Sequence, residues 1–545
     1  MKKKPIKFKT DADTYFDLAE EAFGASDYIN AVHYFYIAYT LSLKDKEAMT
    51  DALFFLGEIY LDVGEYEEAL YYLFKALDRR PDCTDINNTI ASCFLCLNDE
   101  DTAIFYSWAG MSVKSYKDLM HERDDLINEY QLESKKIRLL EKNDQMIIDI
   151  AAKLLTAGDK KYAKELLQTV KPNSPDFLKA CNLLIMICLE DKQAKEALEI
   201  IDEALSQNQN KKESGIFLEF RCWQIVSYHI LKDKENKQRV IDIIEAASLD
   251  FHASRAAVFT YAKINDYKRI RRHIEDVLKK DAFNKNMRVM LSIAHHLCGD
   301  EKNAKIEIVA ASKLYPNDIA IKEIALAISQ KRKGLILAAL MDKKTTASWI
   351  DDIEEALDLI AKNRYEDVPQ KSEFIKKIEW VFQSRLNSLI THAALILGSN
   401  HEFKDFLMDR LTDYELETAP RKTILYSLLV NNAITKFGIV IDGFYQRLSF
   451  KPLNTHNKIL FKAYCKTFAT LVFMENGFET RLNNAAKKIE DRFDELKLND
   501  DEDMLSALLF ALSIKAKLPL SHSAFIFSCD EHTLKTKFDL VKAKK

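Results

Sequence analysis

Apolar residues recur at helical spacing through most of the chain, and the clearest example runs from Leu53 to Pro81. Apolar positions three and four residues apart share one face of a helix, so this stretch predicts two short amphipathic helices. The turn Gly64-Glu65-Tyr66 separates the helices, and Pro81 ends the second, because proline cannot continue the helical hydrogen-bond ladder. Two helices cross closely only where side chains are small, and small residues stand at Gly57, Ala69 and Ala76.

The same pattern returns along the chain at a nearly constant interval. Equivalent small or apolar residues stand 34 residues apart in three places: Ala69 to Ala103, Ala163 to Ala197, and Ile270 to Ala304. The first step, from Ala31 to Ala69, is 38 residues. Eight such units fit between about residues 12 and 316, and a weaker pair of helices follows to about 341. One helix pair cannot bury its own apolar face, so the repeats are predicted to stack on their neighbours.

The unit from Leu53 to Pro81 resembles the tetratricopeptide repeat at nearly every signature position: Leu53, Leu56, Gly57, Tyr60, Gly64, Tyr66, Ala69, Leu73, Ala76 and Pro81. This resemblance implies a right-handed α-solenoid of helix pairs, in which the first helix of each pair lines a concave groove. It also implies a scaffold or adaptor that binds a protein or peptide in that groove.

Beyond the repeats, helical patterns continue but the alanine frame is lost. Residues Phe437 to Tyr445 predict a β-hairpin around the turn Asp442-Gly443, since Asp-Gly between apolar runs favours a tight hairpin turn. The predicted fold is therefore all-α with one β-hairpin. Its expected parts are an N-terminal solenoid of three repeats (1–115), a charged helical insert (116–145), a second solenoid (146–341), a connecting helix and linker (342–370), and a mostly helical C-terminal domain (371–545).

Composition argues against an enzyme. Glycine and proline number only 12 and 9 among 545 residues. A glycine-rich phosphate loop, a nucleophile elbow and a His-x-x-x-His metal pair are all missing from the sequence. We therefore expect no catalysis, cofactor or metal. The nine cysteines lie mostly in apolar helical patterns, no apolar run follows the basic Met1–Pro5, and no stretch is long enough to span a membrane. A cytoplasmic protein without membrane association is the expectation.

Charge refines the prediction of a groove. Residues 10–115 carry 20 acidic and 6 basic side chains, which would repel nucleic acid phosphates. The positions that face the ligand in the tetratricopeptide family are here mostly acidic or aromatic: Asp13, Phe16, Glu20, Phe23, Asp51, Phe54, Glu58, Leu61, Asp62 and Asn88. Family members that grip a C-terminal carboxylate use Lys, Asn and Arg at such places, so we expect a basic or amphipathic peptide instead. The alternative is that these acids only keep the solenoid soluble.

Four other motifs are better explained without a ligand. Cys93 and Cys96 lack a second ligand pair for zinc, and the neighbours His295 and His296 point in different directions on a helix. The basic run 267–273 is typical of a solvated helix face. The acids at 499–503 precede an apolar helix and complement its N-terminal dipole.

The C-terminus supports a rival hypothesis. Residues 520–534 look like a helix-turn-helix, with Ala524 at the crossing, Ser528 near the turn and Leu534 on the inner face of the second helix. On this hypothesis the chain is a transcriptional regulator whose C-terminal module touches DNA. The second helix is sparsely basic, with Lys535 and Lys537, whereas phosphate contacts need more Lys and Arg. A protruding, positive final helix would favour the regulator, and a short, buried one the scaffold.

Overall fold

The structure of the protein is a computed structural model. It describes residues 11–42, 45–111, 147–148, 151, 155, 160–174, 176–207, 215–247, 249–332, 343–498, 501–515 and 518–542. The chain forms two compact units: residues 1–26, 34–124 and 347–545 belong to unit 1, and residues 27–33 and 125–346 belong to unit 2. The predicted insert at 116–145 lies outside the described residues.

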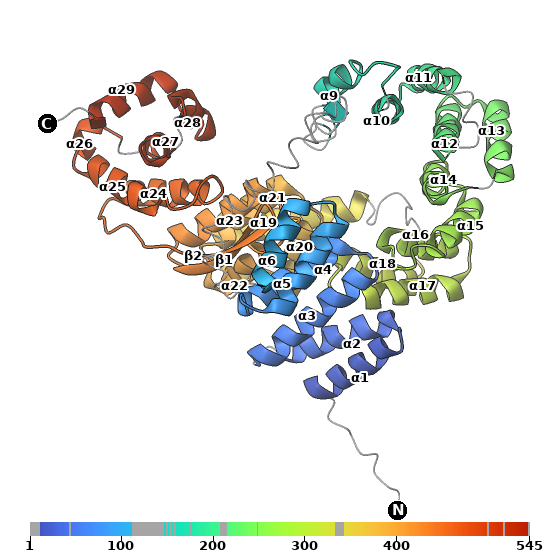
Figure 1. Ribbon diagram of the computed structural model, residues 1–545, viewed down its shortest axis with the longest axis horizontal. Coiled ribbons are helices and arrows are strands. Elements are labelled where there is room, and N and C mark those ends of the chain that lie inside the picture. Colours follow the sequence, from blue (N-terminus) through green and yellow to red (C-terminus); the bar gives the residue numbers. More distant parts are fainter. Residues whose placement is uncertain are drawn as a thin grey trace, which may run out of the picture. The chain divides into compact units, whose positions relative to one another are not determined.

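Three helix pairs open the chain (Figure 1). They are α1 (Ala12–Gly24) with α2 (Tyr28–Leu41), α3 (Lys46–Asp62) with α4 (Tyr66–Arg79), and α5 (Thr84–Cys96) with α6 (Glu100–Met111). The helices of the second pair cross where the sequence predicts, at Gly57. A side-chain carbon there would lie 2.5 Å from Leu73, so only glycine allows this approach.

Unit 2 continues the same architecture. Its helices are α9 (Lys160–Leu167), α10 (Phe177–Glu190), α11 (Ala194–Gln207), α12 (Gly215–Ile230), α13 (Lys234–Ala246), α14 (Phe251–Lys263), α15 (Tyr267–Leu278), α16 (Lys285–Leu297), α17 (Glu301–Leu314) and α18 (Ile319–Ser329). The residues that define the repeat frame in both units are fully buried: Ala31, Ala69, Ala103, Ala163, Ala197, Ile270 and Ala304. The predicted all-α stack of tetratricopeptide-like helix pairs is confirmed.

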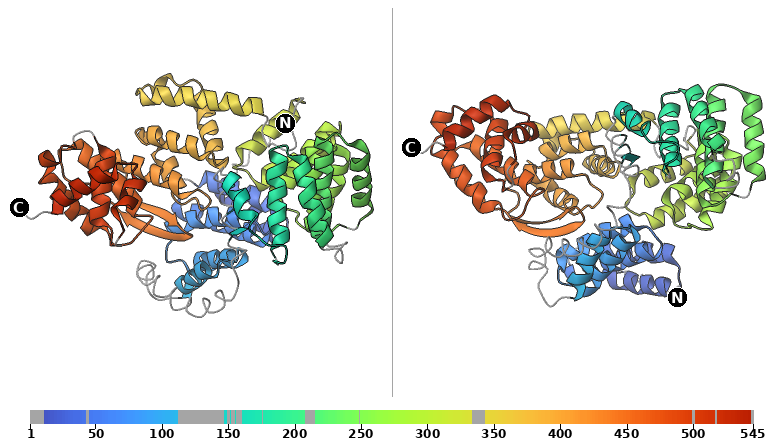
Figure 2. Two further views of the ribbon diagram at one scale, coloured as in Figure 1. Left: turned by 90° about the horizontal axis from the view of Figure 1, so that it is seen from above. Right: turned by 45° about the horizontal axis from the view of Figure 1, so that its top comes forward.

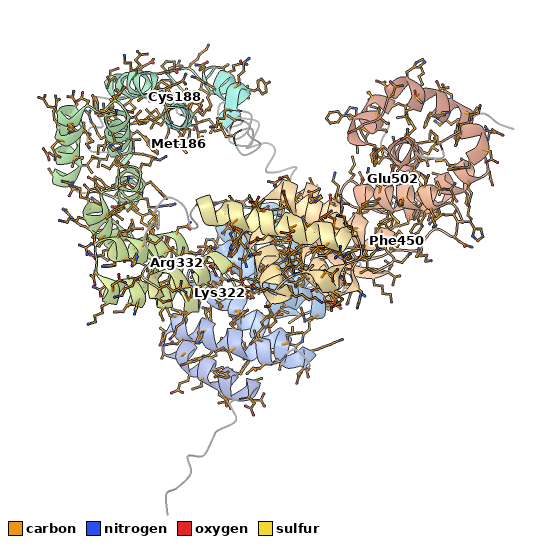
Figure 3. All side chains as sticks on the ribbon, turned by 180° about the vertical axis from the view of Figure 1, so that it is seen from behind. Met186, Cys188, Lys322, Arg332, Phe450 and Glu502 are labelled. Carbon is orange, nitrogen blue, oxygen red and sulfur yellow. The ribbon has the colours of Figure 1, made fainter. Side chains whose placement is uncertain are left out.

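One backbone turn closes the helix pairs of both units. A residue with a left-handed φ, between 51° and 86°, follows the first helix of each pair: Ser26, Gly64, Asn98, Lys192, Lys232, Asn265, Gly299 and Lys331. After every one of these residues except Ser26, the next N–H bonds to a carbonyl five residues earlier, as from Gln193 to Cys188 (2.7 Å) and from Arg332 to Ala327 (3.0 Å). Figure 3 labels Cys188 and Arg332. This is the Schellman ending of a helix, which satisfies carbonyls that the helix leaves unpaired.

Lysine at a left-handed position strains the turn after α10. Lys192 has φ +60° and an exposed side chain, whereas glycine adopts this φ without steric cost. We expect Lys192→Gly to raise the free energy of unfolding of unit 2 by about 0.5–1 kcal/mol, measured by urea denaturation. The control Lys195→Gly, within α11, should lower the free energy of unfolding, because glycine is unfavourable inside a helix. A loss of stability in Lys192→Gly would contradict this account of the turn.

The C-terminal part of unit 1 is also built of helices. They are α19 (Lys343–Ala361), α20 (Lys371–Gln383), α21 (Asn387–Leu397), α22 (Lys404–Arg410), α23 (Thr418–Val430), α24 (Lys458–Leu471), α25 (Glu479–Glu490), α26 (Phe493–Leu496), α27 (Glu502–Ser513), α28 (Leu520–Ile526) and α29 (Glu531–Lys542), with short 3-10 turns at Tyr365–Asp367 and His401–Phe403. Helix α27 is buried on nearly every side by α24, α25, α28 and α29 (Figures 1 and 2). None of the described helices of either unit has the length and apolarity needed to cross a bilayer.

The predicted hairpin is confirmed as β1 (Lys436–Ile441) and β2 (Phe444–Ser449), which pair antiparallel. Asp442 (φ +50°) and Gly443 (φ +83°) form the two-residue turn between them. Both have a positive φ, which is the geometry that matches the twist of a hairpin and that Asp-Gly favours. Phe450, labelled in Figure 3, follows β2 and packs edge-on against Phe468 of α24, with ring centroids 4.9 Å apart.

Within unit 1, residues 404–449 pack against α4 and α6, the second helices of the second and third pairs. The Lys75 ammonium of α4 lies 2.5 Å from the Asp409 carboxylate and 2.7 Å from the Tyr71 hydroxyl. Lys75 is 6% exposed and Asp409 34%. Burial is the largest influence and would lower the pKa of Lys75, but Asp409, Tyr71 and Tyr39 together outweigh it and the pKa is raised. Unit 1 therefore holds both the N-terminal pairs and residues 347–545.

We expect Asp409→Ala to destabilise unit 1, because it leaves the Lys75 charge buried with only the Tyr71 hydroxyl as its partner. The free energy of unfolding should fall by about 2–3 kcal/mol, somewhat less than when a fully buried pair is broken, because Asp409 is partly exposed. Urea denaturation measures it. Asp358→Ala, which breaks the exposed pair with Lys362, should change stability by less than about 0.5 kcal/mol. Equal losses in the two variants would refute a special role for the Lys75–Asp409 pair.

Candidate functional site

The predicted ligand-facing residues of α3 share one face of that helix. Phe54, Glu58 and Leu61 are half-buried and Asp62 is exposed, whereas Leu53, Leu56 and Tyr60 of the same helix are buried in the repeat core. Positions three and four apart on a helix lie above one another, so these four side chains form a continuous strip. We call this strip of α3, together with Asp85 of α5, the inner wall.

Three carboxylates converge on the inner wall. The pKa of Glu58 is raised by burial first and then by the negative charges of Asp62 and Asp85. Burial also raises the pKa of Asp62. Among the described residues, no basic side chain forms an ion pair with any of these three carboxylates. Negative charge is therefore gathered here at a cost in stability, which is a common property of binding surfaces.

Asp51 differs from its neighbours on α3. Its carboxylate lies 2.6 Å from the Arg80 guanidinium, which also donates to the Glu47 carbonyl at 3.3 Å. This pair joins the start of α3 to the end of α4. Asp51 is thus partly neutralised within its own repeat, and the inner wall is most acidic further along, at Glu58 and Asp62.

The aromatic residues of the predicted groove have different surroundings. Phe16 packs edge-on against Phe35 and Phe55, with centroids 5.1 and 5.5 Å apart, so it belongs to the contact between the first and second pairs. Phe23 is half-buried, and Phe54 lies 5.6 Å from the neighbouring ring of Phe55. Of the three, Phe54 shares its helix face with the acidic strip.

The remaining predicted residues lie at the edges. Asp13 and Glu20 are exposed on α1. Asn88 is exposed on α5, and its side-chain amide lies directly against Gly110 of α6. The structure therefore brings together Glu58, Asp62 and Asp85, and it places Asp13, Glu20 and Asn88 outside that cluster.

The cysteine and histidine motifs have ordinary surroundings. Cys93 is buried and Cys96 exposed, and burial raises the pKa of the Cys93 thiol to about 12. His295 contacts Asp300 at 3.1 Å, whereas His296 contacts Glu301 at 3.1 Å and the Arg332 carbonyl at 3.0 Å. Across the described residues, no three His, Cys, Asp or Glu side chains are grouped to hold a metal ion.

The basic run of α15 is largely neutralised by neighbouring acids. Arg269 pairs with Asp266, Arg272 with Glu245 at 3.1 Å, and Arg271 approaches Asp300 at 3.9 Å. His273 is buried and lies 3.0 Å from Glu245. Burial would raise the pKa of Glu245, but the hydrogen bonds from His273 and Tyr261, together with the charges of His273 and Arg272, outweigh it and lower the pKa. This run holds α15 to its neighbours.

The C-terminal helix pair closes with the turn found throughout the repeats. Ser528 has φ +53°, and Cys529 N–H donates to the Ala524 carbonyl at 2.9 Å. Ala524 and Leu534 are buried, as the helix-turn-helix hypothesis also requires. However, the Lys537 ammonium donates to the Leu496 carbonyl at 2.5 Å, so it is held against α26. Of the two lysines considered for phosphate contacts, Lys535 is the exposed one.

The acidic segment before α27 acts as a helix cap in its described part. The Asp501 carboxylate accepts from the Met504 N–H at 2.8 Å, and Asn499 and Asp500 lie outside the described residues. This agrees with the interpretation that acids here satisfy the start of the helix.

A second concave feature was not predicted. A cleft of about 900 Å³ lies in unit 1, lined by the end of α4, by the hairpin and by the residues between α24 and α25. The hairpin itself was predictable from Asp442-Gly443. The cleft was not, because it depends on contacts between residues more than 350 positions apart.

Comparisons with known proteins add little. No family model matches the chain, and no curated protein matches it. One solved structure that does match is the crystal structure of yeast Tom70, which is 14% identical. The alignment covers 97% of each chain, with a TM-score of 0.22. A TM-score this low supports no inference about the fold or the partners of this chain.

We expect Glu58→Gln to stabilise the N-terminal repeats at pH 7. A raised carboxyl pKa means that the folded state holds this proton more tightly than the unfolded state, so ionisation of Glu58 costs stability as the pH rises through its folded pKa. The gain in the free energy of unfolding should be about 0.5 kcal/mol at pH 7, typical of a partly exposed site, and should shrink to a small fraction of that by pH 4, below the ordinary glutamate pKa of about 4.3, where most of this side chain is protonated in both states. Urea midpoints at pH 7 and pH 4 measure it. Glu20→Gln, at an exposed site, should change neither midpoint, and a lower midpoint for Glu58→Gln at pH 7 would contradict the argument.

Proposed function

We propose that the chain is a protein-interaction scaffold of the tetratricopeptide type that binds a basic or amphipathic peptide segment on the inner wall of its N-terminal repeats. The supporting observation is the convergence of Glu58, Asp62 and Asp85, without a basic partner among the described residues. A bound lysine or arginine would supply the missing positive charge. Phe54, half-exposed on the same helix face, would contact the apolar side of an amphipathic ligand.

The packing of unit 1 favours the inner wall over the opposite side. Helix α4 is buried from Tyr72 to Leu77, because residues 404–449 cover its outer face. The first helices α3 and α5 keep their acidic strip accessible. A ligand on the inner wall would therefore not have to displace any contact described above.

The function proposed is recognition without catalysis, in the cytoplasm, and without a cofactor. Helix pairs that bury their apolar faces against one another form a rigid support, and the exposed strip is left for a partner. The regulator hypothesis gains no support from the C-terminal helices, since Lys537 is engaged with α26 and the turn is that of an ordinary repeat.

Binding of a fluorescent amphipathic peptide, with lysines on one face and leucines on the other, tests the proposal. We expect Glu58→Gln/Asp62→Asn/Asp85→Asn to weaken binding about tenfold at low salt, because each lost charge pair at a rim contributes up to about 1 kcal/mol. The wild-type affinity should fall with added salt and that of the variant much less. Fluorescence anisotropy measures both. Phe54→Ala should weaken binding with little change in the salt dependence.

A matched control separates a local site from general negative charge. Glu21→Gln/Glu67→Gln/Glu100→Gln removes the same charge from exposed positions away from the inner wall. It should bind the peptide as the wild type does. If both triple variants lose affinity equally, or neither does, the inner wall is not the binding site.

A further inference from the structure

The backbone of the hairpin shows which of its groups point outward. Val440 N–H donates to the Leu411 carbonyl at 3.1 Å, and Tyr445 N–H donates to the Tyr106 hydroxyl at 2.9 Å. Val440 and Tyr445 face each other across the hairpin, so both direct their backbone N–H groups away from it. Phe450 N–H, in contrast, donates inward to the Thr435 carbonyl at 2.8 Å. In an antiparallel pair, inward and outward residues alternate.

This alternation assigns the outward groups of β2 beyond Tyr445. They belong to Arg447 and Ser449, which face Gly438 and Lys436. Among the described residues, neither the N–H of Arg447 nor that of Ser449 finds an acceptor. Unpaired N–H and C=O groups along a strand edge are a template for a further strand. Along the edge of β2, the outward N–H of Tyr445 is thus bonded to Tyr106, whereas those of Arg447 and Ser449 have no acceptor among the described residues.

The open edge lies in the 900 Å³ cleft. Five consecutive residues of β2, Tyr445–Ser449, line this cleft. Successive residues of a strand point to opposite faces, so a cleft lined by all five runs along the edge and not over one face alone. Opposite the hairpin, buried Val472 and Phe478 give the cleft an apolar wall. An extended chain placed here would have backbone partners on one side and apolar surface on the other.

Charge indicates which kind of extended chain fits. Four carboxylates and two cations line the cleft: Asp78, Asp82, Glu475, Glu479, Lys436 and Arg447. Asp78 and Glu475 already accept hydrogen bonds, from the Tyr445 hydroxyl and the Arg481 guanidinium. The Glu479 carboxylate has no ion pair within the described residues. The excess of carboxylates complements lysine or arginine on the incoming segment.

The edge is held in place before any ligand arrives. The Tyr445 hydroxyl donates to Asp78 of α4 at 2.5 Å, and the Tyr106 hydroxyl donates to the Gly443 carbonyl at 2.9 Å. Phe444 packs edge-on against Phe105, with centroids 5.2 Å apart. These contacts anchor the hairpin to α4 and α6, so ordering the strand adds little to the cost of binding.

We propose that the free edge of β2 binds an extended peptide segment, alternating basic and apolar residues, as a third strand. This site is separate from the inner wall and does not depend on it. Main-chain hydrogen bonds to Arg447 and Ser449 give the affinity. Alternate side chains then reach the apolar wall and the carboxylates, which is the usual division of roles when a peptide extends a sheet.

The decisive variants differ in one backbone N–H. Arg447→Pro and Arg447→Ala both remove the guanidinium, but only proline removes the outward N–H, and an edge strand tolerates proline where its N–H faces solvent. The probe is an acetylated, fluorescent heptapeptide that alternates lysine and valine, bound to the full chain. We expect Arg447→Ala to bind at least as tightly as the wild type, because it removes a cation, and Arg447→Pro to bind at least tenfold more weakly. Ser449→Pro against Ser449→Ala is a second such pair, in case Arg447→Pro disturbs the hairpin.

Two further measurements distinguish this site from the inner wall. In wild-type protein, hydrogen exchange at the amides of Arg447 and Ser449 should slow at least tenfold when the peptide binds. A peptide with an N-methyl group on every residue, which has no backbone N–H on either edge, should not bind in the cleft. The variant Glu58→Gln/Asp62→Asn/Asp85→Asn should retain this binding and this protection. Equal affinity of the proline and alanine variants in both pairs, or unchanged exchange at the two amides, would overturn the proposal.

Discussion

The architecture depends on one constraint: two helices must reverse direction within a few residues and still pack closely. A left-handed residue after the first helix, followed in all of these turns but the one at Ser26 by an N–H that bonds to a carbonyl five residues earlier, provides that reversal. It sets the angle at which the second helix returns, and close packing then requires small residues such as Gly57 at the crossing. The same turn closes pairs that have lost the alanine frame, including α28 and α29.

In unit 1, the first and the second helices of the N-terminal pairs have different surroundings. Helices α4 and α6 are covered by residues 404–449, through the buried pair of Lys75 with Asp409 and the contacts of the hairpin. Burying a charge is favourable only when its partner stays in place, so this packing is specific as well as tight. The first helices remain accessible and carry carboxylates that repel one another. A surface that costs stability and makes no structural contact is where recognition is expected.

The two proposed sites rely on different chemistry. The inner wall offers charge and an aromatic ring, so it selects side chains and weakens with salt. The edge of β2 offers backbone groups, which any extended chain can satisfy, and takes its selectivity from the cleft around it. Both carry excess negative charge, so one partner with separate basic segments could occupy them together. Two moderate affinities joined in this way give much tighter binding than either alone.

Much of the fold was determined by local sequence. Helical periodicity, the returning alanines and Asp442-Gly443 sufficed to predict the helix pairs and the hairpin, because both depend on residues close together in the chain. The acidic strip on α3 was also predictable, since positions three and four apart share a helix face wherever the helix lies. Tertiary structure decided the rest. Phe16 turned toward Phe35 and Phe55, and Asp85 joined Glu58 and Asp62, because neighbouring repeats pack at an angle that no single helix encodes. The burial of Lys75, and the cleft beside β2, arise from contacts between residues more than 330 positions apart. Periodicity along a sequence cannot reveal such contacts, because each depends on how the whole of unit 1 packs together.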